Sequence, residues 1–97
     1  MRLEFDGEVW FWKGPSPYHF IAVPEPECLE IQAVSKLVTY GWGVIPVTVE
    51  LGDTVWTTSL FPKDGGYQVP IKASVRKEAS LNLGDSAHVA LNIELTY

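Results

Sequence analysis

The fold is decided by residues 45–61, whose sequence is IPVTVELGDTVWTTSLF. Apolar and polar side chains alternate on both sides of Gly52-Asp53, which is the pattern of two half-buried strands joined by a tight turn. A two-residue turn pairs Val49 with Trp56 on the buried face. The opposite face then carries Thr48, Thr57 and Ser59. We therefore predict an antiparallel hairpin with one inner and one outer face.

The rest of the chain continues this pattern. Four further segments have strand character: residues 3–11, 18–23, 67–72 and 89–95. Six short strands in one domain, residues 1–97, favour a barrel, because closing the sheet leaves no exposed edge. Helical spacing predicts one amphipathic helix over 27–39 and a short helical turn over 74–79. The predicted fold class is mainly β, a small closed six-stranded barrel with these two helical elements.

Turn and capping residues refine these boundaries. Gly7 interrupts the apolar side of the first strand, which predicts a bulge or a bend. Residues 62–66 predict a second hairpin loop, and Pro70 predicts a strand at an edge or with its missing bond pointing outward. Ser74 is predicted to cap the short helical turn. The apolar positions of the longer helix are Leu29, Ala33, Val34, Leu37 and Val38.

Composition limits the classes of protein to consider. The 97 residues have a formal net charge of −5 and include four residues each of Trp, Tyr and Phe. The chain lacks the roughly 20 apolar residues of a membrane span, and its N-terminus lacks the basic and apolar segments of a signal peptide. Cys28 is the only cysteine, which excludes an intramolecular disulfide and a cysteine-rich zinc site. We expect a cytoplasmic globular domain that does not enter a membrane.

A series of short motifs, taken in order, resembles one protein family. The motifs are Trp42-Gly43, Leu51-Gly52, Thr58-Ser59-Leu60-Phe61-Pro62, Gly66-Tyr67, Val69-Pro70-Ile71-Lys72, Val75-Arg76-Lys77 and Gly84-Asp85. From Phe5 to about Ile93 the chain resembles the small bacterial and archaeal β-barrel family called domain of unknown function 1905. The resemblance implies a six-stranded barrel of the double-split type. It implies no activity, because none is established for the family.

A weaker resemblance lies within the first. Residues 69–76 and Leu83-Gly84-Asp85 are similar to a stretch of AbrB-type swapped-hairpin DNA-binding proteins, in which a second proline often stands at the position of Lys72. Those proteins dimerise to complete one barrel, whereas this chain is long enough to supply every strand. We expect a related topology without the DNA-binding surface. The net charge of −5 also argues against nucleic acid as a partner.

Residues typical of enzymes are sparse. His19 and His88 are the only histidines, and the alternation around His88 predicts an outward position on the surface. Ser59 lies outside any Gly-x-Ser-x-Gly motif. We predict no catalytic residues, no metal site and no cofactor. The alternative left open is a small hydrolase or isomerase that uses Ser59, Lys72 and His19.

Charge and aromatic content point instead to binding. Residues 62–77 hold four basic side chains against one acidic, whereas residues 1–30 hold two basic and six acidic. An aromatic wall beside a cation can hold an acidic ligand. The candidate ligand-binding residues are Trp10, Trp12, Trp42, Ser59, Lys72 and Arg76.

The leading hypothesis is a non-catalytic binding module for a small anionic ligand or an acidic protein partner, acting as a monomer or a weak dimer. Nucleic-acid binding in the AbrB manner is the second hypothesis, ahead of catalysis. Two plainer interpretations stay open. Trp10 and Trp12 would pack under the 27–39 helix, and Arg76 and Lys77 would only balance nearby carboxylates.

Overall fold

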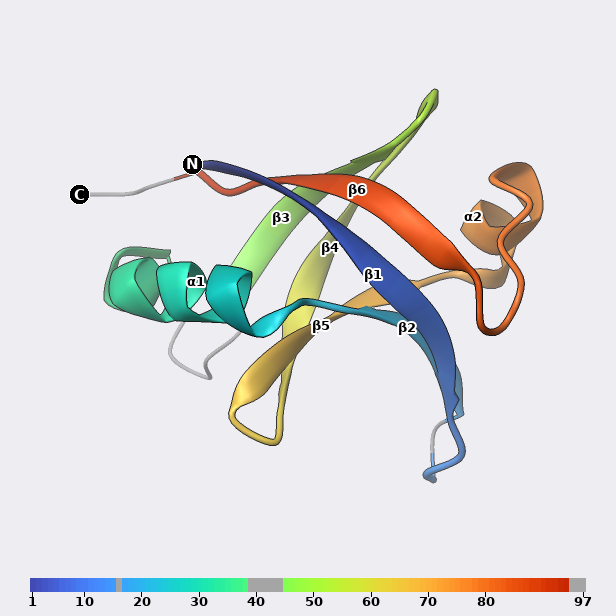
Figure 1. The fold of residues 1–97 in the computed structure, drawn as a ribbon, viewed down its shortest axis with the longest axis horizontal. Coiled ribbons are helices and arrows are strands. Elements are labelled where there is room, and N and C mark those ends of the chain that lie inside the picture. Colours follow the sequence, from blue (N-terminus) through green and yellow to red (C-terminus); the bar gives the residue numbers. More distant parts are fainter. Residues whose placement is uncertain (16, 39–44, 95–97) are drawn as a thin grey trace.

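The computed structural model describes residues 1–15, 17–38 and 45–94. Its strands are β1 (Arg2–Trp12), β2 (Tyr18–Ala22), β3 (Ile45–Leu51), β4 (Thr54–Lys63), β5 (Gly66–Ile71) and β6 (Ser86–Asn92). Its helices are α1 (Glu25–Val38) and α2 (Ala73–Glu78). The strands pair antiparallel and close into a barrel in the order β1-β2-β5-β4-β3-β6 (Figure 1). The predicted fold class, a mainly-β closed six-stranded barrel, is confirmed.

The barrel closes through β1, which is long enough to pair with two neighbours. Residues 2–8 pair with β6, and residues 9–12 pair with β2. Where the partner changes, the Val9 N–H donates to the Asp85 carbonyl at 2.9 Å, and the Val9 carbonyl accepts from the Gly84 N–H at 2.8 Å. One continuous strand therefore belongs to both halves of the sheet.

Alternation along the strands decides which side chains fill the barrel. Every second residue of β1 from Leu3 to Val9 is buried, and the residues between them are exposed. The strand residues with no exposed surface are Val9, Ile21, Ile45, Val49, Val69, Val89 and Leu91. Branched aliphatic side chains of this kind fill the interior of a small barrel at the density of a protein core. The polar and aromatic side chains between them are left to the outer face.

The hairpin of residues 45–61 forms as predicted. Val49 pairs with Trp56, and both side chains are buried. Gly52 begins the two-residue turn with a φ of 57°. Positive φ at this position matches the twist of the two strands and costs glycine little.

Strand β4 is longer than predicted. We expected residues 62–66 to form a loop, but Pro62 and Lys63 continue the strand, and the turn consists of Asp64-Gly65 alone. Both turn residues have positive φ, 51° and 79°. That combination suits a two-residue hairpin turn, so the ladder extends further than the proline suggests. The extra length brings Lys63 onto the outer face of the barrel.

Gly7 does not form a bulge. The pairing of β1 with β6 runs in unbroken register over residues 2–8. A Cβ atom added at Gly7 would lie 2.4 Å from the carbonyl oxygen of Ala22 and 2.6 Å from Cγ2 of Ile21. Glycine is required here because β2 crosses too close to β1 to leave room for a side chain.

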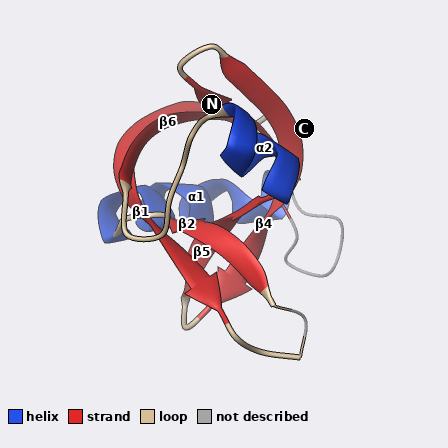
Figure 2. Ribbon diagram, turned by 90° about the vertical axis from the view of Figure 1, so that its right-hand side faces the viewer, coloured by secondary structure: helices blue, strands red, loops and turns tan. Residues whose placement is uncertain are grey.

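The two helices lie at opposite ends of the barrel. In Figure 1, α1 is on the left and α2 on the right, and in Figure 2, seen from the right, α2 lies in front and α1 behind. Helix α1 contacts β3 and β5, and α2 contacts β4. Within the described residues, neither helix is long and apolar enough to cross a membrane.

The buried side of α1 differs from the predicted one. Cys28 and Ile31 face the core, whereas Leu29 is 58% exposed and Ala33 is also exposed. The helix packs across the end of the barrel, where a narrow stripe of positions three residues apart is enough to fill the contact. The predicted side chains of Leu37 and Val38 lie outside the described part of the structure, as does Leu95 of the predicted last strand.

The short helix α2 begins earlier than predicted and without the predicted cap. Strand β5 ends at Ile71, so only Lys72 separates it from the helix. Lys72 occupies the N-cap position and makes no side-chain capping bond, while Ser74 already lies in the first turn. The prediction that Ser74 caps this helix is wrong, because no residues remain between strand and helix for a longer turn.

Strand β5 is an interior strand, although it contains Pro70. It lies between β2 and β4. Its pairing with β4 covers only Gly66–Gln68, and the Pro70 carbonyl accepts a hydrogen bond from Trp56 Nε1 at 3.4 Å. Pro70 is tolerated in this interior strand because the pairing with β4 ends at Gln68, so the N–H that proline lacks would have had no partner on β4.

We expect Gly7→Ala to lower the free energy of unfolding by about 2 kcal/mol, because the new methyl group overlaps the backbone of β2. Gly66→Ala is the matched control. Its Cβ would meet Cys28 Sγ at 3.4 Å, an ordinary contact, so the free energy should stay within about 0.5 kcal/mol of the parent value. Urea denaturation of the three proteins measures both effects. Equal stability of the two variants would contradict the close approach of β1 and β2.

Candidate ligand-binding site

The outer face of β1 and β2 gathers aromatic side chains. Because Val9 points inward, Trp10 and Trp12 alternate with the core positions of β1 and come to the outer side. The register with β2 places Phe20 opposite Trp10 and Tyr18 opposite Trp12. Pairs directly opposite one another on an antiparallel ladder are in side-chain contact. Two strands thus supply four rings to one surface.

Phe20 is the centre of this group. Its ring centroid lies 5.5 Å from that of Trp10, 6.4 Å from Trp12, 5.7 Å from Tyr18 and 5.6 Å from Phe61 of β4. Phe20 is only 4% exposed, although it points away from the barrel interior, whereas Phe61 at the border is 41% exposed. We call these five residues the aromatic face. They form a small second core outside the barrel.

A hydrogen bond fixes one indole ring, and close packing fixes the other. Trp10 Nε1 donates a hydrogen bond to Gln68 Oε1 at 2.8 Å. Gln68 itself lies between Phe61 on β4 and Ala22 on β2. The Trp12 ring is covered by the turn after β1, where a Cβ at Gly14 would lie 2.4 Å from the indole. Both rings are therefore held before any ligand arrives.

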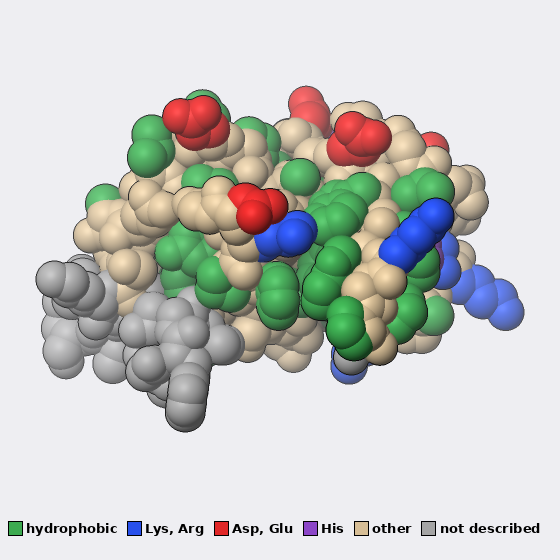
Figure 3. Space-filling model, turned by 90° about the horizontal axis from the view of Figure 1, so that it is seen from below, with side chains coloured by type: hydrophobic (Ala, Val, Ile, Leu, Met, Phe, Trp, Pro, Cys, Tyr) green, Lys and Arg blue, Asp and Glu red, His purple; other side chains and the backbone are tan. Residues whose placement is uncertain are grey.

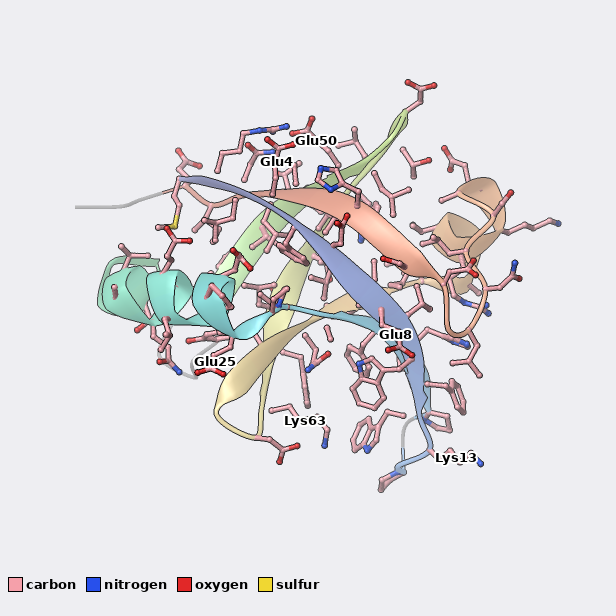
Figure 4. The ribbon with its side chains drawn as sticks, viewed as in Figure 1. Glu4, Glu8, Lys13, Glu25, Glu50 and Lys63 are labelled. Atoms are coloured by element: carbon pink, nitrogen blue, oxygen red, sulfur yellow. The ribbon has the colours of Figure 1, made fainter. Side chains whose placement is uncertain are left out.

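Lys63 supplies the positive charge of this surface. Its side chain is labelled in Figure 4. Its Nζ lies 6.0 Å from the ring centroid of Trp10 and 5.8 Å from that of Trp12. An ammonium group at this distance is attracted by the face of an indole. Its only described ionic partner is Asp64, at 3.7 Å, whose side chain is 87% exposed. Exposed pairs of this kind contribute little, so the ammonium group is available to a ligand.

A groove of about 420 Å³ adjoins the aromatic face, between α1 and the β4–β5 hairpin. It is lined by Val23, Glu25, Cys28, Leu29, Gln32, Lys63, Asp64, Gly65, Gly66, Tyr67 and Gln68. Gln32 Nε2 donates to the Gly65 carbonyl at 2.8 Å and ties the helix to the hairpin. Lys63 and Gln68 border both the groove and the aromatic face. Figure 3 shows hydrophobic side chains gathered on the underside of the barrel, next to basic ones.

The groove holds two weakly acidic groups that stay protonated at neutral pH. Burial raises the pKa of the Cys28 thiol and of the Tyr67 phenol above their ordinary values. The thiol donates to the Val23 carbonyl at 3.3 Å. A nucleophile needs the deprotonated form or a neighbouring base. The thiol and the phenol of the groove are therefore not activated as nucleophiles.

The structure brings together only part of the predicted site. Trp10 and Trp12 lie side by side with Phe20 on the outer face, whereas the main contacts of α1 are with β3 and β5, so the plainer interpretation of these two residues gains no support. Ser59 lies on the outer face of β4, opposite Pro46. Trp42 falls outside the described residues. The cation over the indoles is Lys63 and not one of the two basic residues proposed from the sequence.

Those two basic residues lie at the end of the barrel that carries α2. Lys72 is exposed before the helix, and Arg76 is half-buried within it. Among the described ion pairs, none involves Arg76 or Lys77. The interpretation that these two residues balance carboxylates by direct contact is therefore not supported.

Sequence reasoning missed five members of the site: Tyr18, Phe20, Phe61, Lys63 and Gln68. Alternation identified the outward positions of β4 only as far as Ser59, because a loop was expected from Pro62 onward. Continuing the same period places Lys63 beside Phe61. No local signal shows that Gln68 lies next to Trp10, since this contact depends on the order of the strands.

The two histidines occupy different surroundings. His88 is exposed, as predicted, and its Nδ1 lies 2.9 Å from Asp6 Oδ1 and its Nε2 3.4 Å from Glu4 Oε1. These carboxylates raise the pKa of His88. His19 packs on Phe11, with 4.7 Å between ring centroids, and burial, with the charge of Arg76, lowers its pKa.

Catalytic and metal-binding groupings are not found among the described residues. Hydrogen bonds in this part of the chain join neither histidine to a serine, and no three potential ligands converge on one point. The triad and metal chemistries both need such convergence. The geometry describes a closed barrel with an aromatic face on its outer side.

A small closed barrel with this motif order corresponds to a recognised family. Residues 5–91 match the family model described as a domain of unknown function (DUF1905). The chain therefore belongs to the DUF1905 family, as the resemblance of its motifs implied. No curated protein matches the chain.

We expect the His88 contacts to make stability depend on pH. The folded-state pKa of His88 is above its ordinary value of 6.5, so the stabilisation is complete below that pH and is lost as the pH rises through the folded-state pKa. Thermal unfolding across this range should show a falling melting temperature. His88→Gln should flatten that part of the profile, and an unchanged profile in His88→Gln would contradict the assignment to His88.

Proposed function

We propose that this protein is a non-catalytic binding module. Its ligand is a small molecule that combines a flat apolar group with an anionic group. The observation that carries the proposal is the position of Lys63, whose Nζ lies about 6 Å from two fixed indole rings at the border of the groove. Stacking on an aromatic surface and pairing with one ammonium group are complementary modes of recognition.

The charges around the groove support an oriented ligand. Lys63 lies where the groove meets the aromatic face, while two carboxylates, Asp64 beside it and Glu25 on α1, line the groove. An anionic group is therefore attracted to Lys63 on the side of the aromatic face and repelled on the side of the groove. The flat part of the ligand would cover Phe61, the most exposed ring of the aromatic face.

Other classes of function have less support. Binding of DNA in the AbrB manner needs a cationic surface, and this chain has a net charge of −5. Its barrel also closes within one chain, so a swapped dimer is not needed to complete it. Burial keeps the one thiol and the groove phenol protonated, which argues against a hydrolase or isomerase at this site. We propose a cytoplasmic location and a monomer or weak dimer.

The test uses three naphthalene probes of one shape: 1-naphthalenesulfonate, neutral 1-naphthalenemethanol and 1-naphthylmethylammonium. Tryptophan fluorescence or calorimetry should give the tightest binding for the sulfonate and the weakest for the ammonium. Lys63→Gln should weaken the sulfonate about tenfold, because an ion-assisted contact is lost, and should leave the neutral probe unchanged.

Lys13→Gln is the matched control, since it removes the same charge from an exposed residue of the β1–β2 turn. It should bind the sulfonate like the parent protein. If Lys63→Gln and Lys13→Gln weakened sulfonate binding equally, the effect would come from the net charge of the protein and not from a site at Lys63. Equal affinity for the three probes would overturn the requirement for an anion.

A further inference from the structure

A second pocket lies beside α2 and shares no residue with the aromatic face or its groove. Its volume is about 340 Å³, and it is lined by Ala73, Arg76, Lys77, Ser80, Leu81 and Asn82. Helix α2 is at the opposite end of the barrel from α1 (Figure 1). The pocket is therefore a separate feature of the molecule.

The charge of this pocket is positive. Arg76 and Lys77 contribute two cations, and the lining includes no carboxylate. Neither cation belongs to an ion pair within the described part of the chain. In a protein with an overall charge of −5, two adjacent cations without acidic partners are an unusual concentration of positive charge.

The guanidinium of Arg76 has unused hydrogen-bonding capacity. Its Nε is withdrawn from solvent, and among the described residues it finds no acceptor. A buried donor without an acceptor is energetically costly. Guanidinium groups bind carboxylates and phosphates through two parallel N–H donors. An oxyanion in this pocket would satisfy the donor and the charge together.

The turn that completes the pocket is held by hydrogen bonds from two of its backbone N–H groups. The Leu81 N–H donates to the Arg76 carbonyl at 2.9 Å, and the Asn82 N–H donates to Asp85 Oδ2 at 2.8 Å. Ser80 has a φ of 55°, a conformation that few residues adopt without such support. Ser80 and Asn82 therefore line the pocket together with the two cations.

We propose that this pocket binds a phosphate group, with Arg76 and Lys77 as its charge partners and Ser80 and Asn82 as neutral donors. A tetrahedral dianion matches two adjacent cations better than a carboxylate does, because it offers more acceptor oxygens and more charge. The volume of about 340 Å³ also leaves room for a small organic group on a phosphate monoester. The proposal does not depend on the function assigned to the aromatic face.

His19 provides a reporter for the site. Burial lowers the pKa of His19, and the positive charge of Arg76 lowers it further. A phosphate bound to Arg76 offsets that charge, so the pKa of His19 should rise when phosphate is added. His88 is the internal control, because its ring lies against Asp6 and Glu4, and its pKa should not respond.

The experiment is an NMR titration of the full chain with inorganic phosphate, against chloride at matched ionic strength. We expect saturable shifts at the Arg76 Nε–H and the Ser80 and Asn82 amides, with a rise in the pKa of His19 alone. The same titration with glycerol 2-phosphate distinguishes a phosphate monoester from free phosphate as the ligand. Tighter binding of the ester assigns a phosphate monoester, and equal or weaker binding assigns free phosphate. Shifts that do not saturate, or that chloride reproduces, overturn the proposal.

Variants locate the effect. Arg76→Gln should weaken phosphate about tenfold or more, and Lys77→Gln, at an exposed position, tests the same pocket if the first variant fails to fold. Lys72→Gln is the matched control, because it removes an equal charge next to α2 from a residue outside the lining. Unchanged affinity in Lys77→Gln, or equal weakening in Lys72→Gln, would contradict the site.

Discussion

The double pairing of β1 is the constraint on which the rest of this structure depends. Residues 2–8 hold β6 and residues 9–12 hold β2, so a single strand closes the barrel. Because side chains alternate strictly along a strand, the register that buries Val9 also directs Trp10 outward. A shift of one residue would exchange the two faces. The same register of β1 therefore both closes the core and forms the aromatic face.

Closure also determines which surfaces are left for recognition. Aliphatic side chains fill the interior, and α1 and α2 lie at the two ends. The outer face of β1 and β2 is covered instead by its own rings, packed around Phe20. This arrangement fixes Trp10 and its hydrogen bond to Gln68 before a ligand binds. A preformed surface loses less conformational entropy on binding than one that must be ordered.

Local signals in the sequence predict much of the fold and less of the site. The hairpin of residues 45–61 was predictable in register, because its alternation and its Gly-Asp turn lie within one short segment. The length of β4 was not, because Pro62 is ordinarily a loop residue and only its pairing with β5 keeps it in the ladder. Lys63 was missed for the same reason. Trp12 was recognised as a candidate, but its neighbour Phe61 comes from a strand that only the order of the closed barrel brings close.

Native-state amide hydrogen exchange tests most directly whether β1 joins the two halves of the barrel into one preformed unit. The account predicts that the slowest amides of the β1–β2 ladder and of the β1–β6 ladder exchange with the same free energy of opening. That value should equal the free energy of global unfolding, as for a single cooperative unit. A β1–β2 ladder that opens at a clearly lower free energy, while the β1–β6 ladder stays protected, would contradict the account. The aromatic face would then not be a fixed part of the closed barrel.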